Sequence, residues 1–488
     1  MEQVLVIGAG PVGLTCAAEL ARYGVHVRII DRSPHQSTES KALAIWSRTL
    51  ELMDRMGCTP AFLENGLHCH GASFHNGKTV LGHHRFDNVA SPYNFGLMIP
   101  QVDTERLLIE HLQSFGVTVE RQVELTLFGE APDHVEARLK HADGHEEAVQ
   151  TSWLIGCDGA HSTLRNGLGF SFEGVTDPSD WLLADIRLEG DHQTPSDEIA
   201  AFLHPDGPFA LFPMPKGRTR IIAGFSKSSG GKSKPNPTLQ DVQDLTDKRV
   251  GRGWRVTDPV WLANFYINER KVSEYSKGRI FLAGDAAHIH SPAGGQGMNT
   301  GMQDSINLAW KLALVVREEA SPRLLDTYTP ERSEVGAKVL HNATLMTELG
   351  TLKSPIAQAT RDAVMRFMFG FHSVQEREAT SFTEIELDYS QGLLTVGAHA
   401  GGRFSPRYYD GPPPGIGNKP RFVLFTSDYE QGAAFASRFP GLLDPTPRIS
   451  PDRKRLLLVR PDGYVGLSAT DNDWAAAEEY LRQLVITG

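Results

Sequence analysis

The first thirty residues alternate between short apolar runs and one amphipathic segment. Val4–Ile7 is a run suited to a buried parallel strand. The pattern over 14–23 is helical, and Gly24 stands where a helix commonly ends. A second apolar run covers 25–30. This order of strand, glycine-containing turn, helix and strand predicts a βαβ unit at the start of the chain.

Later segments also differ in their pattern. Residues 116–150 alternate apolar and polar positions around an Ala-Asp-Gly turn, which predicts a hairpin. Residues 176–270 are typical of strands with one helical insert near 239–250, and 228–237 is expected to be a loop because of its Ser, Gly and Lys content. A long helical region is predicted over about 329–377.

These patterns predict an α/β protein of several domains. A Gly- and Pro-rich linker near 398–420 separates off a last segment that reads strand, helix, hairpin, helix. The expected division is a Rossmann-like domain made of 1–175 and 271–397, a β-sheet domain of 176–270 that takes in part of 66–100, and a linker with a C-terminal α/β domain at 398–488.

The composition is that of a soluble globular protein. Of 488 residues, 40% are hydrophobic and 22% are charged, and the net charge is −11 at pH 7. No basic block or basic–aromatic stripe occurs, which argues against nucleic acid or an anionic membrane as a partner. The four cysteines have no CxxC spacing, and the first strand-like run at Val4 leaves no room for a signal peptide. We therefore expect a cytoplasmic protein.

The sequence Gly8-Ala9-Gly10-Pro11-Val12-Gly13 joins the first strand to the first helix with GxGxxG spacing. Gly8 permits the tight turn, Gly10 lets the backbone approach a pyrophosphate, and Gly13 lets the helix pack on the strand. The free N–H groups at the start of the helix favour phosphates. Asp31 ends the second strand, where a carboxylate can accept ribose hydroxyls, and Arg32 follows it. The motif predicts a dinucleotide, either FAD or NAD.

Two further glycine-containing motifs lie at the ends of later strands. One is Gly156-Cys157-Asp158-Gly159, and the other is Gly284-Asp285-Ala286-Ala287-His288, which continues into the glycine-rich stretch 291–301. An NAD domain needs only the first motif, whereas an extended flavin dinucleotide collects contacts from distant segments. The three motifs together favour FAD.

With these motifs the chain resembles the group A flavoprotein monooxygenases, the aromatic hydroxylases such as p-hydroxybenzoate hydroxylase. The match is closer to the phenol and polyketide hydroxylases that carry a thioredoxin-like C-terminal domain. It is carried by GAGPVGL (8–14), GCDGAHSTLR (156–165), 278–312 and LLDTYTPER (324–332), and it is weak across 176–270. The resemblance implies a Rossmann-like FAD-binding domain, a β-sheet substrate domain and a thioredoxin-like C-terminal domain.

The resemblance also implies which residues hold FAD. Lys41 stands where the family often has an arginine near the pyrophosphate, a departure because arginine is the usual bidentate phosphate ligand. Gln101 matches a glutamine that touches FAD, and Asp285 matches the aspartate on the ribityl chain. The full set of expected cofactor residues is Gly8, Gly10, Pro11, Gly13, Asp31, Arg32, Lys41, Gln101, Asp158, Gly159, Gly284, Asp285, Gly297, Met298 and Asn299.

The glycine-rich turn over 294–299 is the predicted catalytic element. Such backbone leading into a helix presents N–H donors and a positive dipole end. A reduced flavin is anionic around N1 and its C2 carbonyl, and these donors stabilise that charge as an oxyanion hole does. The residues concerned are Pro292, which would lie against the ring face, together with Gly295, Gly297, Met298 and Asn299.

The implied reaction has two halves. NADPH or NADH, a transient co-substrate, reduces FAD; O2 then forms a C4a-hydroperoxyflavin that hydroxylates an aromatic or polyketide-like small molecule. Two alternatives stay open. One is an FAD oxidoreductase of the same superfamily without oxygen insertion, such as a reductase or a halogenase, although the WxWxIP sequence of the flavin halogenases is absent. The other is a redox-silent flavin-binding protein.

The β-sheet domain and parts of 66–100 are expected to form a lid over the flavin. The candidate substrate-binding residues are Trp46, Phe202, Phe212, Met214 and Pro292, and core packing is an equal or stronger interpretation of the aromatic ones. The histidines at 68, 70, 83 and 84 do not match a closed zinc set, so no metal site is predicted. Without a cysteine, the C-terminal segment is left with packing or homodimer formation.

Overall fold

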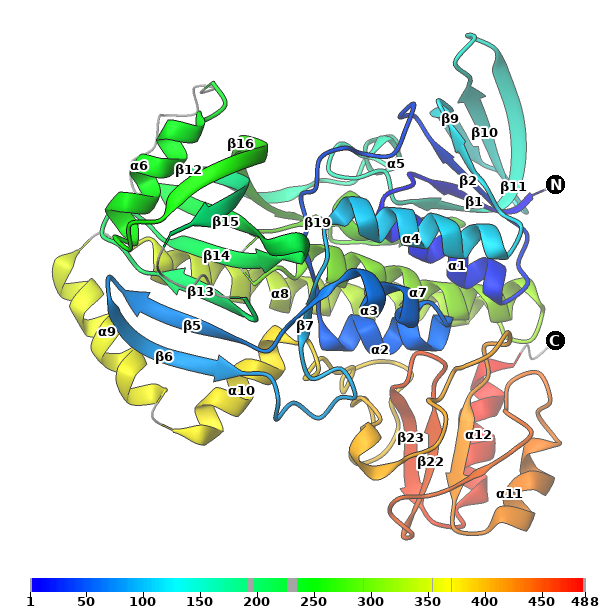
Figure 1. Ribbon diagram of the computed structural model, residues 1–488. Helices are drawn as coiled ribbons and strands as arrows, with labels where there is room; N and C mark the ends of the chain where they lie inside the picture. Colours follow the sequence, from blue (N-terminus) through cyan, green and yellow to red (C-terminus); the bar gives the residue numbers. More distant parts are fainter. Residues whose placement is uncertain are drawn as a thin grey trace.

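The computed structural model describes residues 2–190, 196–225, 235–292, 294–352, 354–369 and 371–485. Figure 1 shows two large sheets in the upper half, long helices beneath them, and the C-terminal region below. Most of the expected loop 228–237 lies outside the described residues. Within the described part, no helix is both long and apolar enough to cross a bilayer.

The first sheet contains the βαβ unit predicted at the start of the chain. Its central strand β1 (Glu2–Ile7) pairs in parallel with β2 (Val27–Asp31) and with β11 (Glu146–Gly156). Val4, Leu5 and Val6 are fully buried, as expected for a parallel strand covered on both faces. The other strands are β8 (Val119–Arg121), β9 (Glu124–Glu130), β10 (Val135–Lys140), β17 (Ser276–Lys277) and β18 (Ile280–Leu282).

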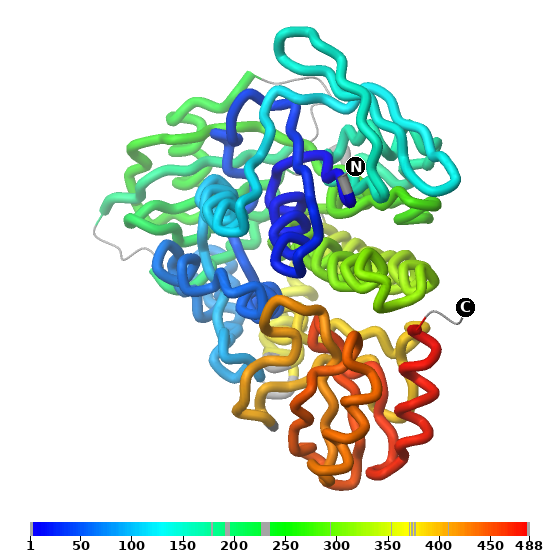
Figure 2. Tube along the Cα trace, turned by 90° about the vertical axis from the view of Figure 1, so that its right-hand side faces the viewer, coloured from blue at the N-terminus to red at the C-terminus, as the bar shows by residue number. Residues whose placement is uncertain are grey.

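Segments far apart in the sequence complete this sheet and its helical layer. β18 pairs in parallel with β11, so residues after 270 join the sheet begun by residue 2. The helices α1 (Pro11–Arg22), α4 (Gln101–Ser114) and α7 (Gly297–Val316) lie side by side against it, as Figures 1 and 2 show. The short helix α5 (Thr163–Gly167) follows β11. The predicted hairpin over 116–150 is confirmed, because β10 pairs antiparallel with both β9 and β11.

The second sheet has the order β19-β16-β12-β15-β14-β13-β5-β6. Two strands from 66–100, β5 and β6, extend it, and the helix α6 (Leu239–Arg249) covers one face. Its strands are β5 (Gly71–Asn76), β6 (Thr79–Arg85), β12 (Glu173–Glu189), β13 (Glu198–Phe202), β14 (Phe209–Met214), β15 (Arg218–Phe225), β16 (Arg255–Lys271) and β19 (His288–Ile289). A three-stranded sheet of β3 (Ala44–Ile45), β7 (Gly96–Met98) and β4 (Leu67–Cys69) lies next to α2 (Ser47–Met56) and α3 (Thr59–Asn65).

The long helical region predicted over 329–377 is interrupted in the structure. α8 (Tyr328–Gly350) ends before Ser354, whose side chain caps α9 (Pro355–Met368). Pro355 is the first residue of α9, a position that proline favours because its missing N–H is not needed there. α10 (His372–Phe382) follows. The proline therefore divides the predicted helix.

The C-terminal domain is a four-stranded sheet with two helices. Its order is β21-β20-β22-β23, from β20 (Val423–Thr426), β21 (Arg448–Ile449), β22 (Arg455–Val459) and β23 (Val465–Thr470), with α11 (Tyr429–Ala436) and α12 (Trp474–Leu484). Arg460, just after β22, is fully buried and pairs with Glu331 of α8 at 2.7 Å. The expectation of an α/β protein is confirmed, while the thioredoxin-like character of this domain stays a prediction.

Candidate active site

A cavity of about 770 Å3 lies between the two large sheets. One end is the glycine turn at the start of α1, the middle is closed by the segment 39–44 and Asp285, and the far end reaches the face of the second sheet. Among the expected residues, those that line it are Gly10, Pro11, Lys41, Gln101, Gly159, Phe212, Asp285, Pro292, Gly295, Gly297 and Met298. One elongated space thus touches all three glycine motifs.

The glycine turn has the geometry that its spacing predicts. Gly8 has a φ of +100°, and a Cβ on it would lie 2.4 Å from the carbonyl oxygen of Cys157. A Cβ on Gly13 would lie 1.9 Å from the carbonyl oxygen of Gly8, so neither position tolerates a side chain. Gly10 is different, because nothing lies within 4 Å of the place its Cβ would take. The turn is therefore packed on its inner side and open toward the cavity, which is the space a pyrophosphate needs.

Asp31 at the end of β2 supports this turn directly. Its Oδ2 accepts a hydrogen bond from the backbone N–H of Ala9 at 2.7 Å, and its Oδ1 accepts one from Ser33 at 2.7 Å. A guanidinium nitrogen of Arg121 lies 3.7 Å from Oδ2, and Asp31 does not itself line the cavity. Each carboxylate oxygen still has a second lone pair that could accept a ribose hydroxyl. Arg32 is exposed and does not line the cavity.

Lys41 and Gln101 both line the cavity, and Gln101 contacts the residue that follows Lys41. The Oε1 atom of Gln101 accepts a hydrogen bond from the N–H of Ala42 at 3.1 Å, and its Nε2 donates to Glu105 at 2.9 Å. The amide of Gln101 therefore holds the segment that carries Lys41. The side chain of Lys41 is exposed, and its backbone oxygen accepts a hydrogen bond from Arg220 at 2.9 Å.

The second and third motifs each place one carboxylate near the cavity. Asp158 caps α5 through Oδ2, which accepts a hydrogen bond from Thr163 at 2.6 Å, while its buried Oδ1 has no partner in the described part of the chain. Asp285 is open to the cavity but lies deep in the protein, so loss of bulk solvent raises the pKa of its carboxyl while His288 and Lys41 lower it. An orphaned carboxylate oxygen and a carboxylate open to the cavity suit a polyhydroxyl ligand, so these residues fit FAD.

Hydrogen bonds from Trp46 and Asn299 fix the predicted catalytic turn. Gly294 and Gly295 have φ values of +85° and +63°, and the indole Nε1 of Trp46 donates to their carbonyl oxygens at 3.0 and 3.2 Å. Asn299 is fully buried, accepts a hydrogen bond from the backbone N–H of Trp46 at 2.8 Å and donates to Ala44 at 2.9 Å. The side chain of Asn299 therefore does not face the cavity as a catalytic or cofactor contact. Its side-chain amide instead makes hydrogen bonds to neighbouring backbone groups that fix the turn.

The predicted substrate-binding role of three further residues also differs from what the structure shows. Phe202 is fully buried, stacks on His75 and belongs to the core beneath α6, on the face of the second sheet that points away from the cavity. Trp46 is 1% exposed and supports the catalytic turn from behind. Met214 packs in the apolar cluster with Leu43 and Met98. None of the three lines the cavity.

The sheet wall of the cavity follows from strand register. Residues directly opposite one another in an antiparallel pair point to the same face. Phe212 lies opposite Arg220, which lies opposite Asp185, which lies opposite Trp261, and all but Asp185 line the cavity. Two positions further along each strand, Leu183, Ile222 and Ala263 lie opposite one another, point to the same face and also line the cavity. The wall is therefore mostly apolar.

Sequence reasoning missed the ion pair in this wall. Arg220 is 1% exposed and binds Asp185 through Nε at 2.7 Å and through a second nitrogen at 2.8 Å. The same guanidinium donates to the backbone oxygens of Ser40 and Lys41. It ties the sheet wall to the segment beside Gln101. An Arg and an Asp on neighbouring strands indicate an ion pair only when the register of those strands is known, and the sequence does not give that register.

His290 follows the third glycine motif in the sequence. It lines the cavity, and its Nδ1 donates to the backbone oxygen of Ser291 at 2.8 Å, which leaves Nε2 as an acceptor. Burial, and next to it the charge of His288, lower the pKa of His290 to about 4, so the ring is neutral near pH 7. The histidines at 68, 70, 83 and 84 do not line the cavity, and no three metal-binding side chains gather among the described residues.

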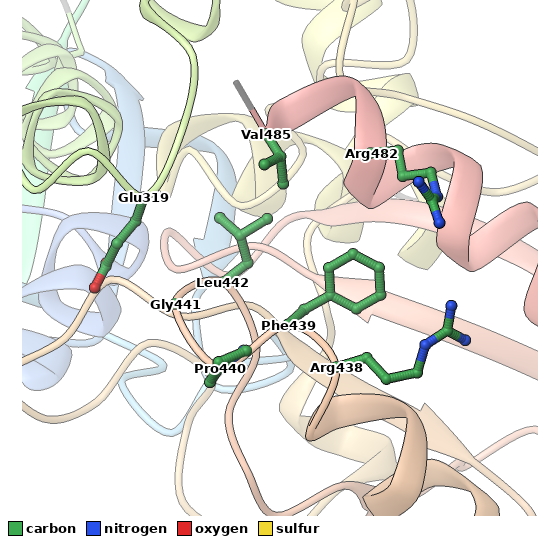
Figure 3. A pocket seen from close by; sticks show the side chains of 8 residues that line it. All are labelled: Glu319, Arg438, Phe439, Pro440, Gly441, Leu442, Arg482 and Val485. Carbon is green, nitrogen blue, oxygen red and sulfur yellow. The ribbon is translucent and has the colours of Figure 1, made fainter. Parts of the chain in front are cut away.

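A second cavity of about 530 Å3 lies beside the C-terminal domain. Figure 3 shows Glu319 on one side of it and Arg438, Phe439 and Arg482 on the other. Both arginines already pair with Glu478, at 2.7 and 2.6 Å. This cavity contains no residue of the three glycine motifs, so it does not belong to the site described above.

Comparison with known proteins decides the family. Residues 1–343 match the FAD binding domain family. The chain belongs to the FAD-dependent aromatic hydroxylases. The family prediction from the sequence motifs is therefore confirmed.

Individual members of the family match most of the chain. The sequence is 38% identical to 6-methylpretetramide 4-monooxygenase of Streptomyces rimosus over 82% of this chain and 72% of the relative. It is 32% identical to rifampicin monooxygenase of Streptomyces venezuelae over 80% of each chain. The structure of the OxyS anhydrotetracycline hydroxylase from Streptomyces rimosus superimposes with a TM-score of 0.80 at 29% identity, covering 99% of this chain and 98% of that one. This relative therefore shares the fold over nearly the whole length of the chain.

Proposed function

We propose that this protein is an FAD-dependent monooxygenase that uses NADPH or NADH and O2 to hydroxylate an aromatic or polyketide-like small molecule. The observation that carries the proposal is the single cavity that joins the glycine turn of α1 to the apolar wall of the second sheet. Cofactor and substrate would share that space. The names of the family members described above contain 6-methylpretetramide, rifampicin and anhydrotetracycline, which supports an aromatic or polyketide-like substrate.

Several residues would hold FAD along the cavity. The open face of Gly10, the start of α1 at Pro11 and the carboxylate of Asp31 suit the ADP half. Gly8 and Gly13 shape that turn from its packed side. Lys41, Gln101 and Asp285 border the middle of the cavity, where the ribityl chain would pass. Asp158 and Gly159 remain candidates for contact with both FAD and the nicotinamide co-substrate.

The protein itself would position the cofactor and the substrate, stabilise negative charge on the flavin and keep water out of the site. When bound, FAD supplies the hydride acceptor and the oxygen chemistry. The start of α7 would present the backbone N–H groups of Gly297 and Met298, which stabilise negative charge on a neighbouring ring. The N–H of Gly295 donates instead to the carbonyl oxygen of Pro292 at 2.9 Å. Trp46 and Asn299 hold that turn in place. The apolar wall around Phe212 and Trp261 orients a flat substrate and excludes water.

The test is substrate-stimulated oxidation of NADPH or NADH in air. Holoenzyme mixed with a panel of phenols and polycyclic aromatics should consume the nicotinamide faster with a substrate, and the product should gain one oxygen atom by mass spectrometry. Consumption without product oxygen would indicate an oxidoreductase or an uncoupled enzyme. Tightly bound flavin without any oxidation of NADPH or NADH would indicate a redox-silent flavin-binding protein. Heat-released flavin that is FMN would contradict the cofactor assignment.

A further inference from the structure

The helix α9 exposes large apolar side chains on its outward face, although Phe369 at its C-terminal end packs inward against Phe74 and His84. Its inward face carries Arg361 and Asp362, which pair with each other at 2.9 Å and are 8% exposed. Arg361 also donates to the backbone oxygen of Leu349, and Asp362 accepts from Asn76 of β5. The outward face carries Ile356 and Phe367, which are 79% and 70% exposed. A surface helix normally shows the opposite arrangement.

The exposed apolar surface extends beyond one helix. Figure 1 shows α9 at the outer edge of the molecule, where it meets the end of α8. The large apolar side chains that are exposed here are Leu345, Met346, Leu349, Ile356, Val364, Phe367, Met368 and Phe371. At roughly 150–200 Å2 for a large side chain, their exposed fractions leave on the order of 700 Å2 of apolar surface. The largest apolar patch on a typical monomer is about 300–600 Å2.

We propose that this surface, the α9 face, is the interface of a homodimer in which α9 packs antiparallel against α9 of a second copy. The exposed area approaches what this occupant needs when the end of α8 joins the contact beside α9, because a stable interface of standard size takes about 800 Å2 from each partner. The spacing fits it as well. Ile356, Thr360, Ala363 and Phe367 follow one another at intervals of four, three and four residues, which places them along one seam of the helix.

The seam is complementary to itself under a two-fold axis. With the axis between Thr360 and Ala363, Ile356 of one copy lies against Phe367 of the other, and the two small residues meet at the centre. Small central residues let the helices approach closely, and large residues at both ends then fill the remaining space. Such an interface is isologous and closes as a dimer. Arg366 lies beside the seam, so no like charges meet across it.

The first experiment is sedimentation equilibrium of the FAD-loaded enzyme between about 0.1 and 100 μM. The wild type should have twice the chain mass in the micromolar range. Ile356→Glu and Phe367→Glu, both at exposed positions that folding does not need to bury, should raise the dimer dissociation constant by roughly 30-fold or more. FAD content should be unchanged. Leu393→Glu, a matched control at a site 69% exposed elsewhere, should leave the dimer intact.

A second experiment tests the antiparallel register. The double variant Thr360→Cys/Ala363→Cys should form a disulfide-linked dimer under mild oxidation, since the four native cysteines are buried and do not compete. A monomeric wild type at 100 μM would overturn the proposal. So would a dimer that both glutamate variants leave intact, or a monomer that sediments with phosphatidylcholine vesicles through this face. Failure of the cysteine pair to cross-link in a proven dimer would overturn the register.

Discussion

Asn299 and Trp46 hold each other across 253 positions of the sequence. The side-chain oxygen of Asn299 accepts the backbone N–H of Trp46 at 2.8 Å. The indole of Trp46 in turn donates to the turn just before Asn299, at the carbonyl oxygens of Gly294 and Gly295. The turn that begins α7 is therefore fixed to the segment preceding α2.

Asn299→Ala should loosen this turn and weaken FAD binding. The change leaves the N–H of Trp46 and the carbonyl oxygen of Ala44 buried without a partner, at a cost of about 1–3 kcal/mol per buried group. Urea unfolding of the apoprotein measures the loss of stability, and flavin fluorescence measures the FAD dissociation constant. Trp46→Phe is a second variant that tests the same clamp, because it keeps an aromatic ring and removes the indole N–H. A normal FAD affinity in both variants would contradict the positioning role.

Asp285→Ala should lose FAD affinity without losing fold stability. Asp285 is open to the cavity, and among the described residues its side chain makes no hydrogen bond that its removal would break. A hydrogen bond between a hydroxyl and a carboxylate is worth about 1.5–3 kcal/mol, so the dissociation constant should rise roughly 10- to 100-fold. Isothermal titration of the apoprotein with FAD is the measurement. An unchanged affinity would show that Asp285 is not a ligand.

Phe212→Ala should change the kinetics of the enzyme, whereas Phe202→Ala should lower its stability. Phe212 lies on the cavity face of β14, so its loss should raise substrate KM or the share of NAD(P)H lost to H2O2, with FAD still bound. Phe202 is fully buried beneath α6, so its loss should destabilise the fold by about 3–5 kcal/mol and leave KM alone. Steady-state kinetics with a peroxide assay, paired with urea unfolding, separates the two effects. The reverse outcome would place the substrate on the other face of the sheet.

Glu384 should make the protein less stable as pH rises. Burial raises the pKa of this carboxyl from 4.5 to about 8, and it accepts hydrogen bonds from Gln303 and Thr300 of α7. Between those two pKa values the folded protein holds a proton that the unfolded chain has released, so this group's contribution to stability falls from about pH 5 to pH 8. Glu384→Gln cannot ionise and should be the more stable protein above pH 8. Urea unfolding at pH 6 and 8.5 compares them, and a constant difference between the two proteins would contradict the raised pKa.

The side of a strand on which a residue lies shows where sequence reasoning reached its limit. Phe209 and Phe212 are an odd number of positions apart in β14, so they point to opposite faces. Phe202 lies opposite Phe209 and shares its buried face. The sequence makes Phe202 and Phe212 equal candidates for the substrate wall, but which face meets the cavity depends on α6 covering the other one. That choice is made by packing, not by pattern.

The glycine motifs, the α/β class and the family could all be determined from the sequence. Their requirements are local: a positive φ at Gly8, a turn without a side chain at Gly10, and a strand that ends at each motif. The tertiary structure decided what depends on partners distant in the chain. It turned Asn299 and Trp46 into a clamp, joined Arg220 to Asp185 across two strands, and left the apolar face of α9 outside. These outcomes depend on which surfaces meet, and a linear pattern of apolar positions does not contain that information.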